Sequence, residues 1–155
     1  MTDQSIILNA LRASADELAH ELDRLPEAVA VWHPAEGEWS QLDCLKHIQV
    51  VERNIFLWRL HAMATQDNPP LPVIDEKELM QKSPVTSRAE LLADFLDARK
   101  EEIALLEKHD WSRPGVHAAR GPISIGWIAH YALGHTWEHL SQMMRVRLSY
   151  DTRKK

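Results

Sequence analysis

The stretch SIGWIAHYALGHTWEHLSQMMRVRLS, residues 124–149, decides the fold that we expect for this chain. Its apolar residues recur at intervals of three and four, which predicts a long amphipathic helix. His135 and His139 are four residues apart, so their imidazoles lie about 40° from each other on one helix face. That face also carries Ile128 and Ala132, and the two histidines are therefore expected to point into the protein core.

The same helical period recurs in three further segments, whereas glycine is scarce and no alternating, β-branched run of strand length occurs. Ser40, and Ser87 with Glu90, have the pattern of helix N-termini. The four expected helices cover residues 3–25, 41–65, 87–109 and 124–149. They predict an all-α protein, a four-helix bundle of a single domain over residues 1–150, followed by a short basic tail at 151–155.

Two connections separate the first three helices. Residues 26–39 form a short connection, and residues 67–84 form the one long irregular stretch, with three prolines near its start. A loop of this size in a small domain is often functional. We therefore expect residues 67–84 to carry function or to cover a site.

The composition restricts the function classes. The 155 residues carry a net charge of −5 and the basic cluster of the tail is short, so we expect no nucleic-acid partner. No apolar run reaches the roughly 18 residues of a membrane span, and the polar start MTDQS lacks signal-peptide character, so no membrane association is expected. Cys44 is the single cysteine, which excludes an intrachain disulfide and is typical of a reducing cytoplasm.

The inward histidine pair has two interpretations, a metal site or hydrogen-bonded core residues. Burying two imidazoles costs free energy unless something satisfies their nitrogen atoms. We therefore favour a metal at His135 and His139 and keep packed core histidines as the alternative. His130 points about 140° to 180° away from this pair, which favours a surface position.

Residues 135–139 also match H-x-x-E-H, the inverted zinc-protease motif, in which Glu138 would be the general base. That motif needs a third, carboxylate ligand well downstream. Only sixteen residues follow His139, and Asp151 is the sole acid among them. Glu138 also lies about 60° from His135 round the helix. We therefore reject the protease interpretation.

The third ligand must come from an upstream helix, and His47 is the best candidate. It borders the apolar stripe of the helix at 41–65, about 40° from Val51. His61 shares this side of the helix but lies about 21 Å further along its axis. The remaining histidines face outward or lie in connections and at a helix end: His20, His33, His109 and His117.

Two stretches resemble the DinB/YfiT-like family of helical bundles. They are Trp32-x-Pro34-x-Glu36-Gly37-Glu38-Trp39-Ser40 with Leu45-Lys46-His47-Ile48 and Glu52, and His135-x-x-x-His139-x-x-Gln142-Met143. Each motif is short, but the combination is fairly specific and covers most of the chain in helix order and length. The resemblance implies a four-helix bundle with one divalent metal held by His47, His135 and His139. A departure is Leu140, where many members have a small or basic residue.

The resemblance also implies an activity. Characterised relatives include thiol-dependent S-transferases that use bacillithiol or mycothiol, and a mycothiol-dependent maleylpyruvate isomerase; members often form homodimers. We accordingly expect a cytoplasmic, homodimeric, metal-dependent transferase that conjugates a low-molecular-weight thiol to a small electrophile. The alternatives are a metal-dependent hydrolase of a small molecule and a non-catalytic, metal-binding dimeric module. Zinc or nickel is the expected ion, and the family name, which derives from a damage-inducible gene, suggests a stress response.

Supporting residues for the metal ligands can be named as well. Ligating histidines usually donate their other N–H to a carboxylate or carbonyl. Asp43 lies one turn before His47, and Gln142 lies three residues after His139, so both are in position to accept such a bond; Glu52 is the third candidate.

The chain offers no obvious nucleophile of its own. Cys44 lies about 60° from His47 round the helix and is expected to pack in the core as a small hydrophobe. This favours an exogenous thiol on the metal, with hydrolysis by metal-bound water next. We expect most tryptophans to pack in the core or in a lid, and one or two to line a pocket for an apolar substrate: Trp32, Trp39, Trp58, Trp127 and Trp137.

Overall fold

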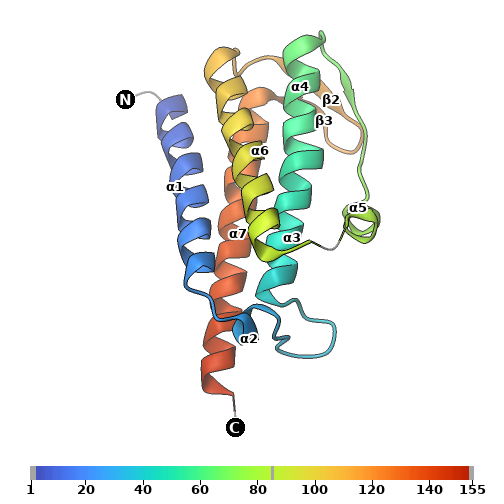
Figure 1. The fold of residues 1–155 in the computed structure, drawn as a ribbon. Coiled ribbons are helices and arrows are strands. Elements are labelled where there is room, and N and C mark those ends of the chain that lie inside the picture. Colours follow the sequence, from blue (N-terminus) through green and yellow to red (C-terminus); the bar gives the residue numbers. More distant parts are fainter. Residues whose placement is uncertain (1–2, 85, 154–155) are drawn as a thin grey trace.

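The computed structural model describes residues 3–84 and 86–153. Four long helical segments run side by side as a bundle, as the sequence predicts (Figure 1). They are α1 (Asp3–Asp23), the continuous segment α3 (Gln41–Val51), η1 (Glu52–Phe56) and α4 (Leu57–Thr65), then α6 (Arg88–Lys108) and α7 (Ile125–Thr152). Within the described part of the chain, no helix has both the length and the apolar character needed to cross a membrane.

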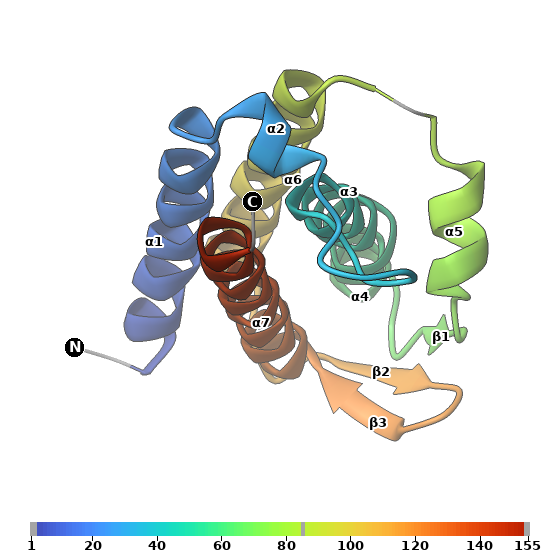
Figure 2. The same cartoon turned by 90° about the horizontal axis from the view of Figure 1, so that it is seen from below.

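The directions of the helices explain the long connection between α4 and α6. α1 and α7 run one way, and α3–α4 and α6 run the other way (Figure 1). Because α4 and α6 are successive long helices that run in the same direction, the chain must return along the outside of the bundle before α6 begins. This return carries β1 (Pro70–Leu71) and α5 (Glu76–Lys82), which lies outside α3 (Figure 2).

Two short helices lie in the connections between the first three long helices. α2 (Glu27–Ala30) follows Pro26, and Asp75 caps the N-terminus of α5, because its carboxylate accepts the Glu78 N–H. The expectation of an irregular stretch at 67–84 was therefore wrong in part. α7 also extends to Thr152, so the helix enters the predicted basic tail, of which residues 154–155 lie outside the described part.

A small sheet closes one end of the bundle, although the sequence predicted no strand. β2 (Pro114–His117) pairs antiparallel with β3 (Gly121–Ser124) and parallel with β1. The strands have two to four residues, too few for alternation to show in the sequence. Gly121 has φ of +76°, which favours glycine at the turn between β2 and β3. A Cβ at Gly115 would lie 2.8 Å from a Leu71 methyl carbon, so glycine allows β2 to approach the core.

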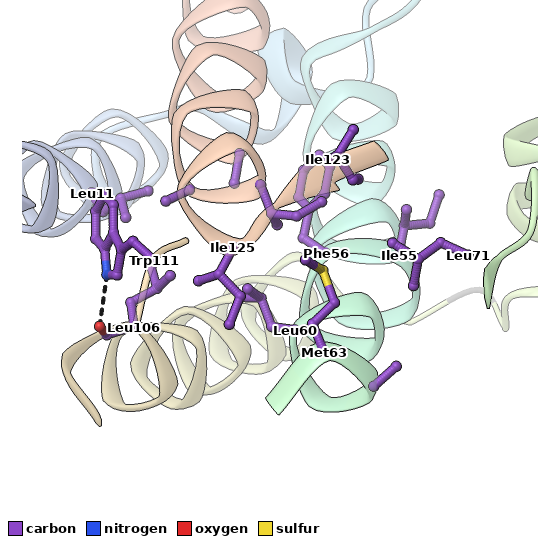
Figure 3. Packing of buried hydrophobic residues seen from close by; sticks show 14 of the residues in the cluster. Leu11, Ile55, Phe56, Leu60, Met63, Leu71, Leu106, Trp111, Ile123 and Ile125 are labelled. Atoms are coloured by element: carbon purple, nitrogen blue, oxygen red, sulfur yellow. Dashed lines mark hydrogen bonds between the residues drawn. The ribbon is translucent and has the colours of Figure 1, made fainter. Parts of the chain in front are cut away.

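Two apolar clusters fill the bundle. Figure 3 shows the one beside the sheet, where the Trp111 indole N–H donates to the Leu106 carbonyl at 2.8 Å. The other lies toward α2 and the C-terminal end of α7 and includes Leu18, Phe95 and Leu140. Leu140 is 1% exposed, so this departure from the family pattern is a core residue.

A buried ion cluster lies where the two apolar clusters meet. The Arg99 guanidinium on α6 forms an ion pair with Glu52 of η1, and its Nε lies 3.0 Å from a carboxyl oxygen of Glu102 on α6. It also donates to Ser14 on α1 at 3.1 Å and to Thr136 on α7 at 2.8 Å. One side chain thus connects all four helical segments of the bundle.

Candidate metal centre

Three histidines from two helices meet between α3 and α7. His47 lies in the second turn of α3, and His135 and His139 lie one turn apart near the middle of α7. One ring nitrogen of each lies within 4.8 Å of the others, and the Nε2 atoms of His47 and His135 are 3.0 Å apart. The structure therefore brings together the three histidines that the sequence singled out.

The helix that carries His47 has a well-defined start. Ser40 accepts the Asp43 N–H, and the Asp43 carboxylate accepts the Ser40 N–H, which is a capping box. This fixes the first turn of α3 and so the direction in which His47, one turn later, leaves the helix.

The donor set suits a divalent ion. In a tetrahedral zinc site with Zn–N bonds of about 2.0–2.1 Å, two ligand nitrogens are separated by roughly 3.3 Å. The 3.0 Å between the Nε2 atoms of His47 and His135 is close to that separation. Burial, followed by the charge of His139, lowers the pKa of His47 to about 4 and that of His135 to about 3. Both rings are therefore neutral at physiological pH, and a neutral imidazole is the form that binds metal.

Gln142 orients one of the three rings. Its amide oxygen lies 2.9 Å from His139 Nδ1, so the ring donates through Nδ1 and keeps the lone pair of Nε2 for a ligand. The Nδ1 atoms of His47 and His135 are buried and have no hydrogen-bond partner among the described residues. These two rings have aromatic packing partners instead, since Phe56 lies edge-on to His135 at 5.4 Å and Trp39 lies 4.9 Å from His47.

The other two expected supporting residues lie elsewhere in the hydrogen-bond network. The Asp43 carboxylate accepts from Ser40 and His33, because the N-terminus of α3 offers unpaired donors closer than His47. Glu52 is fully buried and pairs with Arg99 on another helix. The expectation that Asp43 and Glu52 support the histidine rings was therefore wrong.

Trp39 and α5 border the histidines. The Trp39 ring stacks on His139 at 5.9 Å and lies 4.9 Å from His47. It lines a cavity of about 620 Å³ beside His139 and Gln142 and another of about 520 Å³ beside His47. One carboxylate oxygen of Glu76 on α5 lies 3.6 Å from His47 Nε2. The histidines therefore have an open side that a small molecule can reach.

The sequence did not point to Glu76, and it led us to expect His117 in a connection, outside any strand. The only signal for Glu76 was the expectation that residues 67–84 cover a site, because nothing in their sequence places one side chain beside His47. His117, assigned to a loop, is buried in β2. Glu138 is exposed, which agrees with rejecting the protease motif. The Cys44 thiol is buried in the core, as expected, and burial raises its pKa to about 12.

His20 and His130 are exposed, as the helix geometry predicted, and His33 is exposed in the first connection. His61 is exposed as well, although an ideal helix places it on the same side as His47; the π-helical segment η1 between the two residues departs from that ideal register. His61 pairs with Glu101 and is not part of the central site.

Comparison with known proteins identifies the family. The sequence model of the DinB superfamily matches residues 10–143 of this chain. The chain belongs to the DinB superfamily. A comparison of this DinB-superfamily chain with curated proteins finds no match.

Two solved structures share the fold of this DinB-superfamily chain. YfiT from Bacillus subtilis, described as a probable metal-dependent hydrolase with an unusual four-helix bundle topology, has 16% identity and a TM-score of 0.71, covering 92% of this chain and 90% of YfiT. TT2238, described as a four-helix bundle protein, has 22% identity and a TM-score of 0.66, covering 92% of this chain and 98% of TT2238. At these identities the likeness establishes the fold.

Proposed function

We propose that this chain is a metal-dependent enzyme that acts on a small molecule at the site of His47, His135 and His139. The observation that carries the proposal is the convergence of three imidazoles, two of them neutral at physiological pH, beside an open side lined by cavities. Three protein ligands with an open position are typical of catalytic rather than structural zinc sites. A divalent ion held there lowers the pKa of a bound water or thiol and supplies a nucleophile near neutral pH.

Each residue of the site has a distinct role in this proposal. His47, His135 and His139 are the ligands, and Gln142 fixes the ring of His139 through Nδ1. The Glu76 carboxylate, 3.6 Å from His47 Nε2 and half-exposed, accepts a hydrogen bond from the nucleophile and orients it. Trp39 packs against the rings of His47 and His139.

Hydrolysis is the reaction that this arrangement favours. A carboxylate beside the open side, such as that of Glu76, can accept the proton that an attacking water releases. YfiT, which shares the fold, is described as a probable metal-dependent hydrolase, which agrees with this choice.

Thiol transfer is the second candidate, and the two cavities beside Trp39 support it. A transferase must hold a thiol and an electrophile together, and the cavity of about 620 Å³ borders His139 while that of about 520 Å³ borders His47. The chain contributes no thiol of its own to this site, because Cys44 is buried in the core. A bacillithiol- or mycothiol-type cofactor would then be the second substrate.

Product analysis distinguishes the two reactions. Zinc- or nickel-loaded protein is incubated with panels of small esters, amides and electrophiles, in ¹⁸O-labelled water, with and without a low-molecular-weight thiol. Hydrolysis places the label in the product, whereas transfer places the thiol there. His135→Ala serves as the site-dead control and Glu138→Ala as the matched control on the exposed face of α7. Absence of turnover with both panels, in protein that retains its metal, would refute an enzymatic role.

A further inference from the structure

A separate cavity of about 400 Å³ lies beside the histidine site, between η1–α4, the start of α7 and the connection that precedes α5. Two arginines line it, Arg59 from α4 and Arg120 from the turn between β2 and β3. In the described part of the chain, neither arginine has an ion-pair partner within 4 Å. Glu76 is the one acid among the lining residues, so the charged side chains around the cavity sum to a net positive charge.

Arg59 is a buried cation with unused hydrogen-bonding capacity. It is 6% exposed, and its Nε has no hydrogen-bond partner among the described residues. One of its terminal nitrogens donates to the Pro72 carbonyl at 3.3 Å, which is a long bond. The Glu76 carboxylate attracts Arg59 only from beyond 4 Å, and a buried guanidinium without a close anionic partner is costly. Such a group is stabilised when an anion enters the cavity.

The other polar residues of the cavity also suit an anion. Arg120 lies over the rings of Trp127 and Tyr131 at 5.4 and 5.6 Å, which keeps its guanidinium at the cavity rim. His117 is buried, and its Nδ1 accepts the Ala119 N–H, so the ring proton lies on Nε2 as a donor. Burial, followed by the charges of Arg59 and Arg120, lowers the pKa of His117, which reflects the positive potential here.

This cavity adjoins the histidine site. Glu76 lines both this cavity and the one beside His47. Phe56 lines the cavity and packs against His135, and Tyr131 lies one turn before His135 on α7. Trp127, which also lines the cavity, precedes His135 by eight residues, or about 12 Å along the helix axis. An elongated small molecule can therefore reach from Arg59 toward the histidines.

We propose that this cavity binds the carboxylate of an elongated, largely apolar substrate whose other end reaches the histidine site. This inference rests on the proposed function and names the substrate class. The single buried guanidinium suits a singly charged, planar carboxylate, which an arginine can bind with two parallel hydrogen bonds. The apolar part of the substrate packs on the stacked rings of Trp127 and Tyr131.

Binding to metal-free protein tests the anion cavity apart from the metal. Chelator-treated protein is titrated with benzoate, with the neutral analogue benzamide and with phenyl phosphate, and followed by proton–nitrogen NMR. We expect benzoate to shift the Arg59 Nε–H signal and the Trp127 indole signal, and to bind at least about tenfold more tightly than benzamide, as a charge-assisted pair requires.

Variants assign the binding to the two arginines. Arg59→Gln is expected to weaken benzoate binding by about tenfold or more, and Arg120→Gln, at the exposed rim, by about threefold. Arg53→Gln is the matched control, because Arg53 is on the same continuous helical segment but pairs with Asp94. Arg120→Gln alone decides the question if Arg59→Gln does not fold.

The outcomes separate the two proposals. Benzoate binding that is equal to benzamide binding, or unchanged in Arg120→Gln, would overturn the anion cavity. Tighter binding of phenyl phosphate than of benzoate would overturn the assignment to a carboxylate. Failure of the chain to bind metal would instead overturn the proposed function, since this titration uses metal-free protein throughout.

Discussion

Replacing Arg99 with methionine is expected to destabilise the bundle by about 3–5 kcal/mol, because it removes the one cation of the buried ion cluster. The Arg99 side chain is 2% exposed and Glu52 is fully buried. Besides its ion pair with Glu52, Arg99 donates to the Leu11 carbonyl, Ser14 and Thr136. Without it the Glu52 carboxylate has no buried cation beside it, whereas methionine fills most of the vacated volume. A typical domain has about 5–15 kcal/mol of stability, so the loss is a large part of the total.

Arg53→Met is the matched control for this substitution. Arg53 pairs with Asp94 and Asp97 near the surface, where its side chain is 27% exposed. Exposed ion pairs contribute only about 0.2–1 kcal/mol each. Urea unfolding at pH 7 measures both variants against the wild type. A loss in Arg99→Met no larger than in Arg53→Met would refute the view that the buried cluster holds the helices together.

Glu102→Gln tests the charge state of the same cluster. Burial and the like charge of Glu52 raise the pKa of Glu102 well above its ordinary value of 4.5, which favours the protonated form of Glu102 in the folded protein. A neutral amide is then a close substitute, and we expect a cost below about 1.5 kcal/mol. Above pH 4.5 the unfolded chain releases this proton and the folded chain keeps it, so the wild type loses stability with rising pH relative to Glu102→Gln. A pH-independent difference between the two proteins would contradict a protonated Glu102.

Three further predictions concern the histidine site and its surroundings. Ser40→Ala removes the capping box of α3 and should lower the free energy of unfolding by about 1 kcal/mol, measured by urea titration. Gln142→Ala should weaken metal binding about 10- to 100-fold in a chelator competition, and the exposed Glu138→Ala should leave it unchanged; equal effects would refute the orienting role. The pKa values of His47 and His135, about 4 and about 3, lie below the ordinary 6.5, so the unfolded chain takes up protons first. Metal-free protein should therefore lose stability as pH falls below 6.5. An equal loss in a variant that carries both His47→Gln and His135→Gln would show that these two histidines are not its cause.

The parts of this structure that depend on local sequence could be predicted. Helical periodicity and the serine caps predicted the four long helices. The angular spacing of residues on an ideal helix predicted that His135 and His139 form an inward pair. His47 followed because it borders an apolar stripe on its own helix. Gln142 was predictable for the same reason, since its contact with His139 spans three residues of one helix.

The parts that depend on contacts between distant segments could not be predicted. Glu52 was expected beside the metal ligands, but it pairs with Arg99, which lies 47 residues away. Glu76 reaches His47 because α5 crosses outside α3, a path that the sequence of the connection does not specify. Strand β2 depends on pairing with both β1 and β3, and the short length of the three strands hides them from pattern analysis.

The metal content of protein purified without chelators tests the central claim most directly. A site of three histidine ligands with an open position predicts about one divalent ion per chain, zinc or nickel, by elemental analysis. His47→Ala, His135→Ala and His139→Ala should each release the ion, whereas His61→Ala, on the exposed side of α4, should retain it. Protein that contains no metal and cannot be loaded with zinc or nickel, or that keeps its metal in all three histidine variants, would contradict this account.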